Sequence, residues 1–542
     1  MVRPLSDRPS FESLRKEAKR RLRELRVSGS ALGLREVQQM LAREHGFAGW
    51  AALKEHCELR ALDQASEAER VAEFLTRACL SYGRDDWPDK WRRAERIRMH
   101  HPEVARANLY CACVAGELER VRELLAADAT LATRPGGPQA WPPLLFVCYG
   151  RLPHPPAGEH ALAIARLLLD HGADPDSYFL WDDTYHFSAM TGAIGKGELG
   201  QPAHPRAREL VELLLARGAS PNEGQGLYDD MLEGDDPTWL ELLLAHGLTA
   251  EHLTNWSSHA PMRLLDYLLG HAIKEGHIAR ARCLLAHGAR PDVPDYYDHR
   301  TGHENAMLAG NLELAELLLQ HGATPAELGG RDAFVAACMR VDAPAARRLL
   351  DGHPEYLEHV DPLIEAAERG RVEPVRLMLD LGTSPNRVGK HDKLPLHVAS
   401  GREDGRELVA LLLDGGADAC ARVYGGTAAR WAIMAGQIEL ARFIAERSRH
   451  PHDAAESGHV ELLAELLAQD ASAARRVDPN GNTPLHRLPE DVERAREVLE
   501  LLLRHGADAA ARNQAGLTPA AAFEERGLDE LADLVESRSG AA

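Results

Sequence analysis

One stretch of the sequence, residues 179–205, gathers several side chains that could do chemistry. It reads FLWDDTYHFSAMTGAIGKGELGQPAHP and places two adjacent carboxylates beside two aromatic residues and an imidazole. Carboxylates can act as general acid and base, and a carboxylate with an imidazole can hold a divalent metal. Aromatic rings with carboxylates also suit a sugar ring or a cationic ligand. The residues concerned are Trp181, Asp182, Asp183, Tyr185 and His186.

Groups of the same kind recur downstream as far as Glu304. Aromatic residues are only 5% of the chain, so their gathering beside carboxylates and imidazoles is informative. If the protein is an enzyme, paired carboxylates favour a hydrolase of glycosides or esters, and their separation would decide between retention and inversion. The catalytic candidates are then Asp182, Asp183, Asp229, Asp230, Asp298 and His186. The binding candidates are Trp181, Tyr185, Tyr228, Trp256, His259, Tyr296, Tyr297, His299, His303 and Glu304.

A non-catalytic interpretation of the same residues stays open. Aspartate favours turns and solvent, and Trp181 and Tyr185 could simply pack beneath the long segment from Gly195 to Pro205. The sequence GAIGKGELG resembles a phosphate loop, but it lacks the Gly-Lys-Ser/Thr ending and follows no buried strand. No cofactor is predicted and no metal ligand is assigned, although the Asp and His residues leave a divalent metal open.

The elements that must position these side chains come from an internal repeat. The phrase LLLDHGADP at 167–175 returns, for example, as LLLARGASP at 213–221, LLLQHGATP at 317–325 and LLLRHGADA at 501–509. A second phrase, such as AGNLELAELL at 309–318, precedes many of these by about one helix. The glycine-to-glycine step is often 30 to 34 residues, as from Gly288 to Gly322. Such periodicity predicts stacked units rather than one large core.

The physics of one unit follows from these phrases. The leucine run has the spacing of a helix with a wide buried stripe. The glycine that follows suits the left-handed position just past a helix end, and Ala-Asp-Pro then turns the chain outward. Thr483 can cap the next helix, and Pro484 fits its first turn. Because so short a helix pair cannot bury its own apolar face, the units must stack.

The motif NTPLH at 482–486, with weaker copies LPLHVA at 394–399 and LTPAAA at 517–522, resembles the helix-opening signature of ankyrin repeats. The resemblance covers roughly residues 104–536 and about a dozen units, with insertions in the units of 141–221. It implies an all-α solenoid of helix-turn-helix units with β-hairpin fingers, whose hairpins and first helices line a concave face. Most such arrays bind proteins and have no chemistry.

Nine histidines are explained by the repeat and are therefore predicted to be structural. Five precede a capping glycine, where the carboxyl end of a helix favours a hydrogen-bond donor. Two occupy the Thr-Pro-Leu-His position, where the family resemblance implies that the imidazole ties adjacent hairpins, and two are turn residues. In this order they are His171, His246, His287, His321 and His505, then His397 and His486, then His277 and His459.

The first part of the chain differs from the repeat. Ser10 can cap a helix whose one face carries apolar residues, and two further helices follow up to about residue 60. This segment resembles the helical leader of many bacterial ankyrin proteins, which suggests a bacterial origin. Its basic first helix is expected to be a solvated face docked on an acidic body, with nucleic-acid or membrane contact as the alternative. The predicted domains are a leader and connector (1–100), a first ankyrin-like unit (101–140), irregular units with the candidate site (141–303), and regular units with a C-terminal cap (304–542).

Composition limits the environment and the partners. The 542 residues include 63 basic and 83 acidic side chains, a net charge of −20, which opposes binding to nucleic acid. Eight cysteines without paired CxxC spacing favour reduced thiols. The first residues have no apolar core for export, and no apolar run approaches membrane-spanning length. We therefore expect a cytoplasmic protein, outside membranes, and a monomer.

Two functions follow from the sequence. The first is a binding scaffold that engages a protein or a small carbohydrate-like ligand through the concave face and hairpin tips of the array. The alternative is a hydrolase for glycosides or esters, with metal assistance left open, whose acidic, aromatic and histidine groups lie in the groove around residues 181–304. An enzyme should show a closed pocket with perturbed carboxylates, and a scaffold a shallow open groove.

Overall fold

The structure is a computed structural model that describes residues 5, 10–27, 34–254, 256, 261–295, 299–526 and 528–539. The chain forms two compact units, which are described separately. Unit 1 comprises Met1–Cys57 and Gly329–Ala542, and unit 2 comprises Glu58–Leu328. The domain boundaries predicted at residues 100, 140 and 303 are placed where the repeat pattern of the sequence changes, not where one compact unit ends. These boundaries stay a prediction.

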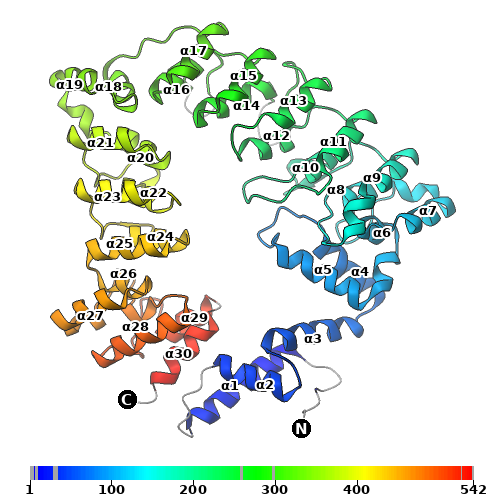
Figure 1. The fold of residues 1–542 in the computed structure, drawn as a ribbon, viewed down its shortest axis with the longest axis horizontal. Helices are drawn as coiled ribbons and strands as arrows, with labels where there is room; N and C mark the ends of the chain where they lie inside the picture. Colours follow the sequence, from blue (N-terminus) through cyan, green and yellow to red (C-terminus); the bar gives the residue numbers. More distant parts are fainter. Residues whose placement is uncertain are drawn as a thin grey trace. The chain divides into compact units, whose positions relative to one another are not determined.

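Unit 2 is a stack of antiparallel helix pairs with a β-hairpin, in which the chain runs from the blue to the green ribbons of Figure 1. The strands of its described residues, β1 (Tyr178–Trp181) and β2 (Tyr185–Ser188), pair antiparallel with Phe179 opposite Phe187. Its helices are α4 (Glu67–Ala78), α5 (Pro88–His100), η1 (Pro102–Arg106), α6 (Leu109–Ala115), α7 (Leu118–Ala127), η2 (Ala129–Ala132), α8 (Pro143–Cys148), α9 (Pro155–Asp170), α10 (Ala189–Ile194), α11 (Ala207–Ala216), α12 (Gly224–Met231), α13 (Thr238–Ala245), α14 (Leu264–Glu275), α15 (Ile278–Ala286), α16 (Gly302–Leu308) and α17 (Leu312–Gln320).

Unit 1 contains the N-terminal helices and the later repeats. Its described strands, β3 (Arg422–Val423) and β4 (Gly426–Thr427), form a second short hairpin. Helix α3 begins in unit 1 and ends in unit 2. The helices are α1 (Phe11–Val27), α2 (Leu34–Glu44), α3 (Trp50–Asp63), α18 (Gly330–Met339), α19 (Ala343–Gly352), η3 (Pro354–Glu358), α20 (Asp361–Glu368), α21 (Val372–Asp380), η4 (Lys390–Asp392), α22 (Pro395–Ser400), α23 (Arg406–Asp414), α24 (Ala428–Met434), α25 (Ile438–Ser448), α26 (Pro451–Glu456), α27 (Val460–Gln469), η5 (Ala471–Arg475), η6 (Pro484–His486), α28 (Val492–Arg504), α29 (Pro519–Glu525) and α30 (Asp529–Ser539).

The ends of the second helices confirm the predicted role of the histidines that precede glycine. In each case the imidazole Nδ1–H donates to the backbone carbonyl four residues earlier, a group that a helix end leaves without a partner. The distance is 2.9 Å for His171 to Leu167 and 3.0 Å for His321 to Leu317. The same bond recurs at 2.8–2.9 Å in His246, His287 and His505.

A second set of histidines ties successive repeats of unit 1. Nε2 of His397 donates to the carbonyl of Gly426 at 3.2 Å, and Nε2 of His486 donates to Leu517 at 3.2 Å. These bonds confirm the structural prediction for the Thr-Pro-Leu-His position. His452, which the sequence did not single out, makes the equivalent bond to Asn482 at 2.7 Å.

The basic helix α1 is largely neutralised by nearby carboxylates. Arg20 pairs with Glu24 at 2.5 Å, and Arg21 pairs with Glu17 at 2.8 Å. Lys19 Nζ lies 3.4 Å from Glu524 Oε1 of α29, so the leader contacts the last repeat of unit 1. These contacts favour the docked, solvated interpretation of this helix over a nucleic-acid surface.

Two further predictions concern the environment of the chain. In the part of the chain that the structure describes, no helix has the length and apolar character needed to cross a membrane. The cysteines are free thiols, and most are buried, as predicted, although Cys420 is exposed. Burial raises the pKa of the Cys79 and Cys148 thiols to about 12, so these thiols stay protonated.

Candidate functional site

The first candidate residues lie on the hairpin of β1 and β2. Asp182 and Asp183 are the central residues of its turn, with φ of 51° and 53°, in a three-residue loop that Thr184 completes. Positive φ at both central residues is what the favoured hairpin turn requires, and aspartate tolerates it. Both side chains are exposed, so their identity is explained by turn geometry, and they stand apart from any enclosed site.

The aromatic residues of this hairpin divide into an inner pair, Phe179 and Phe187, which pack on Trp141 and Tyr82, and an outer group near the tip. The Trp181 ring lies 6.0 Å from those of Tyr185 and Phe187, measured between centroids. His186 stacks on Tyr178 at 3.6 Å, and partial burial lowers its pKa. The outer aromatic residues therefore form the accessible part of the finger, in which Trp181 keeps 37% of its surface accessible.

Asp229 and Asp230 lie in helix α12, whereas the sequence placed them at a hairpin tip. The difference arises because the unit of residues 222–250 has no finger of its own and opens directly into this helix. Asp229 is 2% exposed, and its Oδ1 accepts a hydrogen bond from Gln225 Nε2 at 2.9 Å. Oδ2 has no hydrogen-bond partner among the described residues. Burial raises the pKa of Asp229 to about 8.

Asp230 is held between two cations. Its Oδ1 lies 2.6 Å from Lys196 Nζ, and its Oδ2 lies 2.6 Å from Arg280 Nη2. Arg280, which is also buried, donates from Nε to the carbonyl of Gly234 at 2.7 Å. These bonds join the loop after α10 to α12 and α15. The carboxylate is thus neutralised within the stack, and its role is structural.

The Gly-rich stretch of residues 195–205 is a packed loop rather than a phosphate site. Lys196 bridges Gln201 in a short antiparallel turn, with φ of 66° at Lys196. The buried Arg151 guanidinium donates to the carbonyls of Pro202 at 2.9 Å and Gly192 at 2.7 Å. Tyr82 donates to the carbonyl of Gly195 at 3.1 Å. Arg151 thus joins the segment that follows α8 to the loop of residues 195–205, and both lie in the units for which the sequence predicts insertions.

Sequence reasoning also missed a buried glutamate beside this loop. Glu223 accepts hydrogen bonds from Ser188 Oγ at 2.5 Å and from Thr191 Oγ1 at 2.7 Å. Burial raises its pKa. The residue also caps α12 by accepting from the Gly226 N–H at 3.0 Å. Its position at a helix start was the only available signal, since its hydroxyl partners lie more than 30 residues earlier.

Seven further predicted residues divide into three groups. His303 Nδ1 accepts from the Ala326 N–H at 3.0 Å, and Glu304 completes a capping box with Thr301. His299 is exposed in a turn, with φ of 60°. These contacts give His303 and Glu304 structural roles. Four predicted residues lie outside the described part of the chain: His259, Tyr296, Tyr297 and Asp298.

Unit 2 has a groove of about 640 Å³, which lies along the first helix of each of three successive helix pairs. Helices α12, α14 and α16 form its floor, and Leu253 with residues 261–263 and 290–295 forms its walls. Its lining residues come from these helices and from segments beside them in the chain, and it is partly open to solvent. Residues that give it an apolar surface include Tyr228, Leu232, Leu253, Met262, Tyr267 and Val293.

Aromatic packing supports one side of the groove. Trp256 packs edge-on against Tyr228 at 6.0 Å and against Tyr267 at 5.0 Å, measured between ring centroids. Tyr228 also donates to Glu198 Oε1 at 3.1 Å. The structure thus brings together Tyr228 and Trp256 of the predicted set. Trp181 is not among the residues that line this groove in the described structure.

The polar groups of the groove fix its walls. Asp266 of α14 is buried and accepts from both the backbone N–H and the Nε of Arg290, each at 2.8 Å. Arg263 Nε donates to the carbonyl of Ala250 at 2.5 Å. Gly270 of α14 allows the wall at residues 290–295 to lie close to this helix, because a Cβ at position 270 would be only 3.2 Å from Asp295 Oδ2. The exposed apolar groups are Leu232, at 38% accessible, and Leu253, at 46%.

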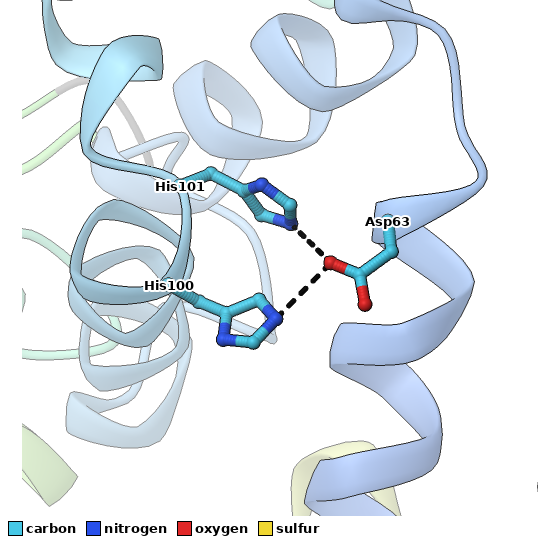
Figure 2. Close-up of side chains that lie close together, drawn as sticks. All are labelled: Asp63, His100 and His101. Carbon is cyan, nitrogen blue, oxygen red and sulfur yellow. Dashed lines mark hydrogen bonds and ion pairs between the residues drawn. The ribbon is translucent and has the colours of Figure 1, made fainter.

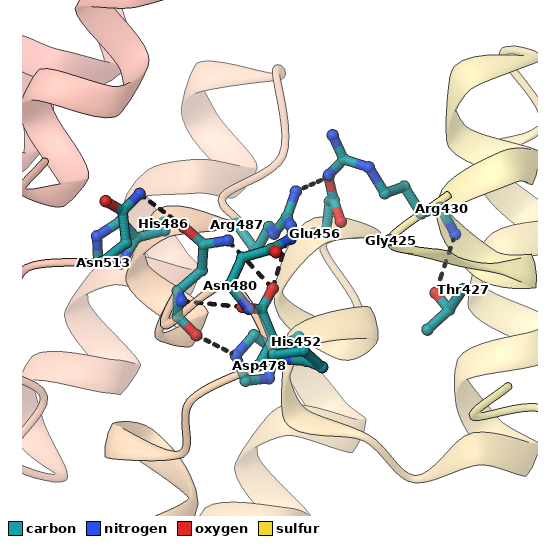
Figure 3. A network of polar contacts seen from close by, with 12 residues as sticks. Gly425, Thr427, Arg430, His452, Glu456, Asp478, Asn480, His486, Arg487 and Asn513 are labelled. Carbon is teal, nitrogen blue, oxygen red and sulfur yellow. Dashed lines mark hydrogen bonds and ion pairs between the residues drawn. The ribbon is translucent and has the colours of Figure 1, made fainter. Parts of the chain in front are cut away.

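Unit 1 holds a second polar cluster, which Figure 3 shows in its last repeats. Glu456 pairs with Arg430, and Arg487 Nη2 lies 3.1 Å from Asp478 Oδ2. Although burial opposes it, hydrogen bonds from Asn482 and Arg487 lower the pKa of Asp478 to about 2. Asn513 Nδ2 donates to Asn482 Oδ1 at 3.0 Å. Glu456 also lies 3.9 Å from Arg487, so it contacts a cation in the repeat before it and one in the repeat after it, and this cluster joins neighbouring repeats.

Stacked helix pairs with short fingers and an open groove along the first helices define a repeat-array scaffold. Residues 480–514 match the family model of the ankyrin repeat. An ankyrin repeat protein of Escherichia coli (strain K12), YahD, is 26% identical over 190 residues, which are 31% of this chain and 92% of that protein. The chain is an ankyrin-repeat protein, and ankyrin repeats are protein-interaction scaffolds. Among solved structures, the ankyrin repeat domain of Bcl-3, a member of the IkappaB protein family, is 22% identical, with a TM-score of 0.26, over 39% of this chain and 98% of that one.

Proposed function

We propose that the protein is a binding scaffold whose unit 2 groove receives an extended segment of a partner protein. The observation that carries this proposal is the open groove of about 640 Å³, with Leu232 and Leu253 exposed at its surface. Exposed apolar residues around a preformed groove are typical of interaction sites. The walls are already fixed by the Asp266–Arg290 contacts, so binding needs little ordering of the scaffold.

The chemistry of the groove indicates what the partner segment should carry. An apolar side chain would fill the space between Leu232, Leu253 and Tyr267. Residues flanking that side chain are expected to be neutral or basic, since the chain carries a net charge of −20 and Asp295 lines the groove. Arg263 and Arg290 add little positive field, because Asp266 and backbone carbonyls engage them.

Hydrolysis has less support as the function. A carboxyl with a pKa of about 8 could serve as a general acid at neutral pH, and Asp229 is such a group. However, Asp229 is only 2% exposed, and its neighbour Asp230 is neutralised by Lys196 and Arg280. Turnover of a chromogenic glycoside or ester that vanishes in Asp229→Asn would revive the hydrolase.

The groove can be tested before the natural partner is identified. Peptides selected from a displayed random library on the full chain are expected to contain an apolar anchor with neutral or basic flanks. The variant Leu253→Asp should bind these peptides about 10- to 100-fold more weakly, because the substitution removes an apolar contact and introduces a charge. Fluorescence polarisation of the selected peptides measures this loss in Leu253→Asp.

The matched control is Leu312→Asp. Leu312 of α17 is 54% exposed and is not among the residues lining the groove in the described structure. Its variant carries the same charge change and should bind the peptides as the unaltered chain does. Equal affinities for Leu253→Asp and the unaltered chain, or a library that yields no specific peptide, would remove the groove as the binding site.

A further inference from the structure

Three metal-ligating side chains meet at the beginning of unit 2, away from the groove (Figure 2). Asp63 is the last residue of α3, His100 is the last residue of α5, and His101 follows directly. Asp63 Oδ1 lies 3.1 Å from His100 Nε2 and 3.3 Å from His101 Nε2. One carboxylate oxygen thus faces two imidazole nitrogens that belong to consecutive residues.

The environment of His101 is that of a ligand rather than of a solvated side chain. The residue is 9% exposed, and its Nε2 has no hydrogen-bond partner among the described residues despite its proximity to Asp63. A buried polar atom without a partner is costly, and most such atoms in proteins are satisfied. Figure 2 shows this nitrogen directed at the same oxygen as His100 Nε2.

We propose that Asp63, His100 and His101 form a binding site for a divalent transition-metal ion of the zinc class. For metal–ligand bonds of about 2.1 Å, tetrahedral geometry places ligand atoms about 3.4 Å apart. The separations of 3.1 Å and 3.3 Å from Asp63 are close to that edge, and all three ligand atoms lie within 4.8 Å of one another. Three protein ligands leave the fourth position for water or for a group from a partner.

The donor set determines which ions fit. Two imidazole nitrogens and one carboxylate oxygen suit Zn²⁺, Co²⁺ or Ni²⁺, whereas Mg²⁺ and Ca²⁺ require oxygen donors. Glu103 Oε1 lies 3.4 Å from His101 Nδ1, on the side of the ring away from Asp63. A carboxylate in that position fixes the ring and its tautomer in many metal sites. The bound ion would join the carboxyl end of α3 to that of α5.

The test uses the full chain, stripped of metal with a chelator and then titrated with Zn²⁺ against a chromogenic zinc indicator. Because the chain has 27 histidines, the informative quantity is the difference between variants. His100→Ala and Asp63→Asn should each weaken one binding equivalent at least about tenfold. His100→Ala is the preferred variant, since this side chain is exposed and its loss should not affect folding.

His459→Ala is the matched control. His459 also lies beside two carboxylates, Glu446 at 3.3 Å and Glu461 at 3.5 Å, but among the described residues no second histidine joins this group. It should leave the zinc titration unchanged. Co²⁺ supplies a second readout, since tetrahedral coordination gives strong visible absorption that His100→Ala should abolish. The proposed site would be overturned if the unaltered chain bound no Zn²⁺ in the titration. It would also be overturned if the Zn²⁺ titration and the Co²⁺ spectrum were unchanged in His100→Ala and Asp63→Asn.

Discussion

Replacing Asp229 with asparagine is expected to stabilise unit 2 by up to about 5 kcal/mol at pH 8 and to have almost no effect near pH 3. The folded chain keeps the carboxyl protonated until about pH 8, because burial raises its pKa from 3.8. The unfolded chain loses this proton near pH 4. Between these values the folded state binds more protons, so stability falls as the pH rises. Asparagine is neutral throughout and removes this loss, and its amide oxygen can still accept from Gln225.

Urea unfolding followed by tryptophan fluorescence from pH 3 to pH 8 measures this effect, with the buried Trp141 as a reporter in unit 2. Asp183→Asn is the control. Asp183 is exposed, and both aspartate and asparagine tolerate the positive φ at this position. The unaltered chain and Asp183→Asn should lose stability together as the pH rises. A parallel pH dependence in Asp229→Asn would show that this carboxyl does not titrate as its burial requires.

The second large effect is expected from Arg280→Met, which should destabilise unit 2 by about 3–5 kcal/mol. Methionine cannot supply the charge that faces Asp230 Oδ2 at 2.6 Å, and the carbonyl of Gly234 also loses its donor. Lys196 still contacts the other carboxylate oxygen, but that side chain is partly solvated. The buried carboxylate is then left half-compensated. Denaturant unfolding at neutral pH gives the difference in free energy.

Arg282→Met is the matched control on the same helix. Arg282 is exposed and lies 3.9 Å from Glu313, so its loss should cost less than about 1 kcal/mol. Replacing both buried partners, in the double variant Arg280→Met and Asp230→Leu, should recover part of the stability, because the buried carboxylate is gone and Lys196 keeps Glu233 at 3.6 Å. If Arg280→Met were no worse than Arg282→Met, the buried pair would not hold this part of the stack.

The repeat could be predicted from the sequence because its determinants are local. A histidine before glycine, as at His321, bonds a carbonyl four residues away, and that distance is set by the helix itself. The Thr-Pro-Leu-His position at His486 reaches the next repeat, which the period of the chain already places beside it. Helix ends, turns and the stacking of units therefore follow from short segments of sequence.

The candidate site was harder to predict, as two Asp-Asp pairs show. Asp182 and Asp183 are exposed in a turn, whereas Asp229 and Asp230 are buried in a helix. What separates these environments is distant in sequence: Lys196 and Arg280 reach Asp230 from 34 and 50 residues away. The cluster of Asp63, His100 and His101 escaped prediction for the same reason, since 37 residues separate Asp63 from His100. Periodicity gives the stacking of repeats, but it does not give these tertiary partners.

Hydrogen–deuterium exchange on the full chain, with and without a selected peptide, tests the proposed scaffold most directly. The proposal predicts slower exchange in helix α14 (Leu264–Glu275) and in residues 290–295, which form the floor and one wall of the groove. Helices α15 and α17 should exchange as in the free chain. Protection confined to those two helices, or to unit 1 alone, would contradict binding in the groove.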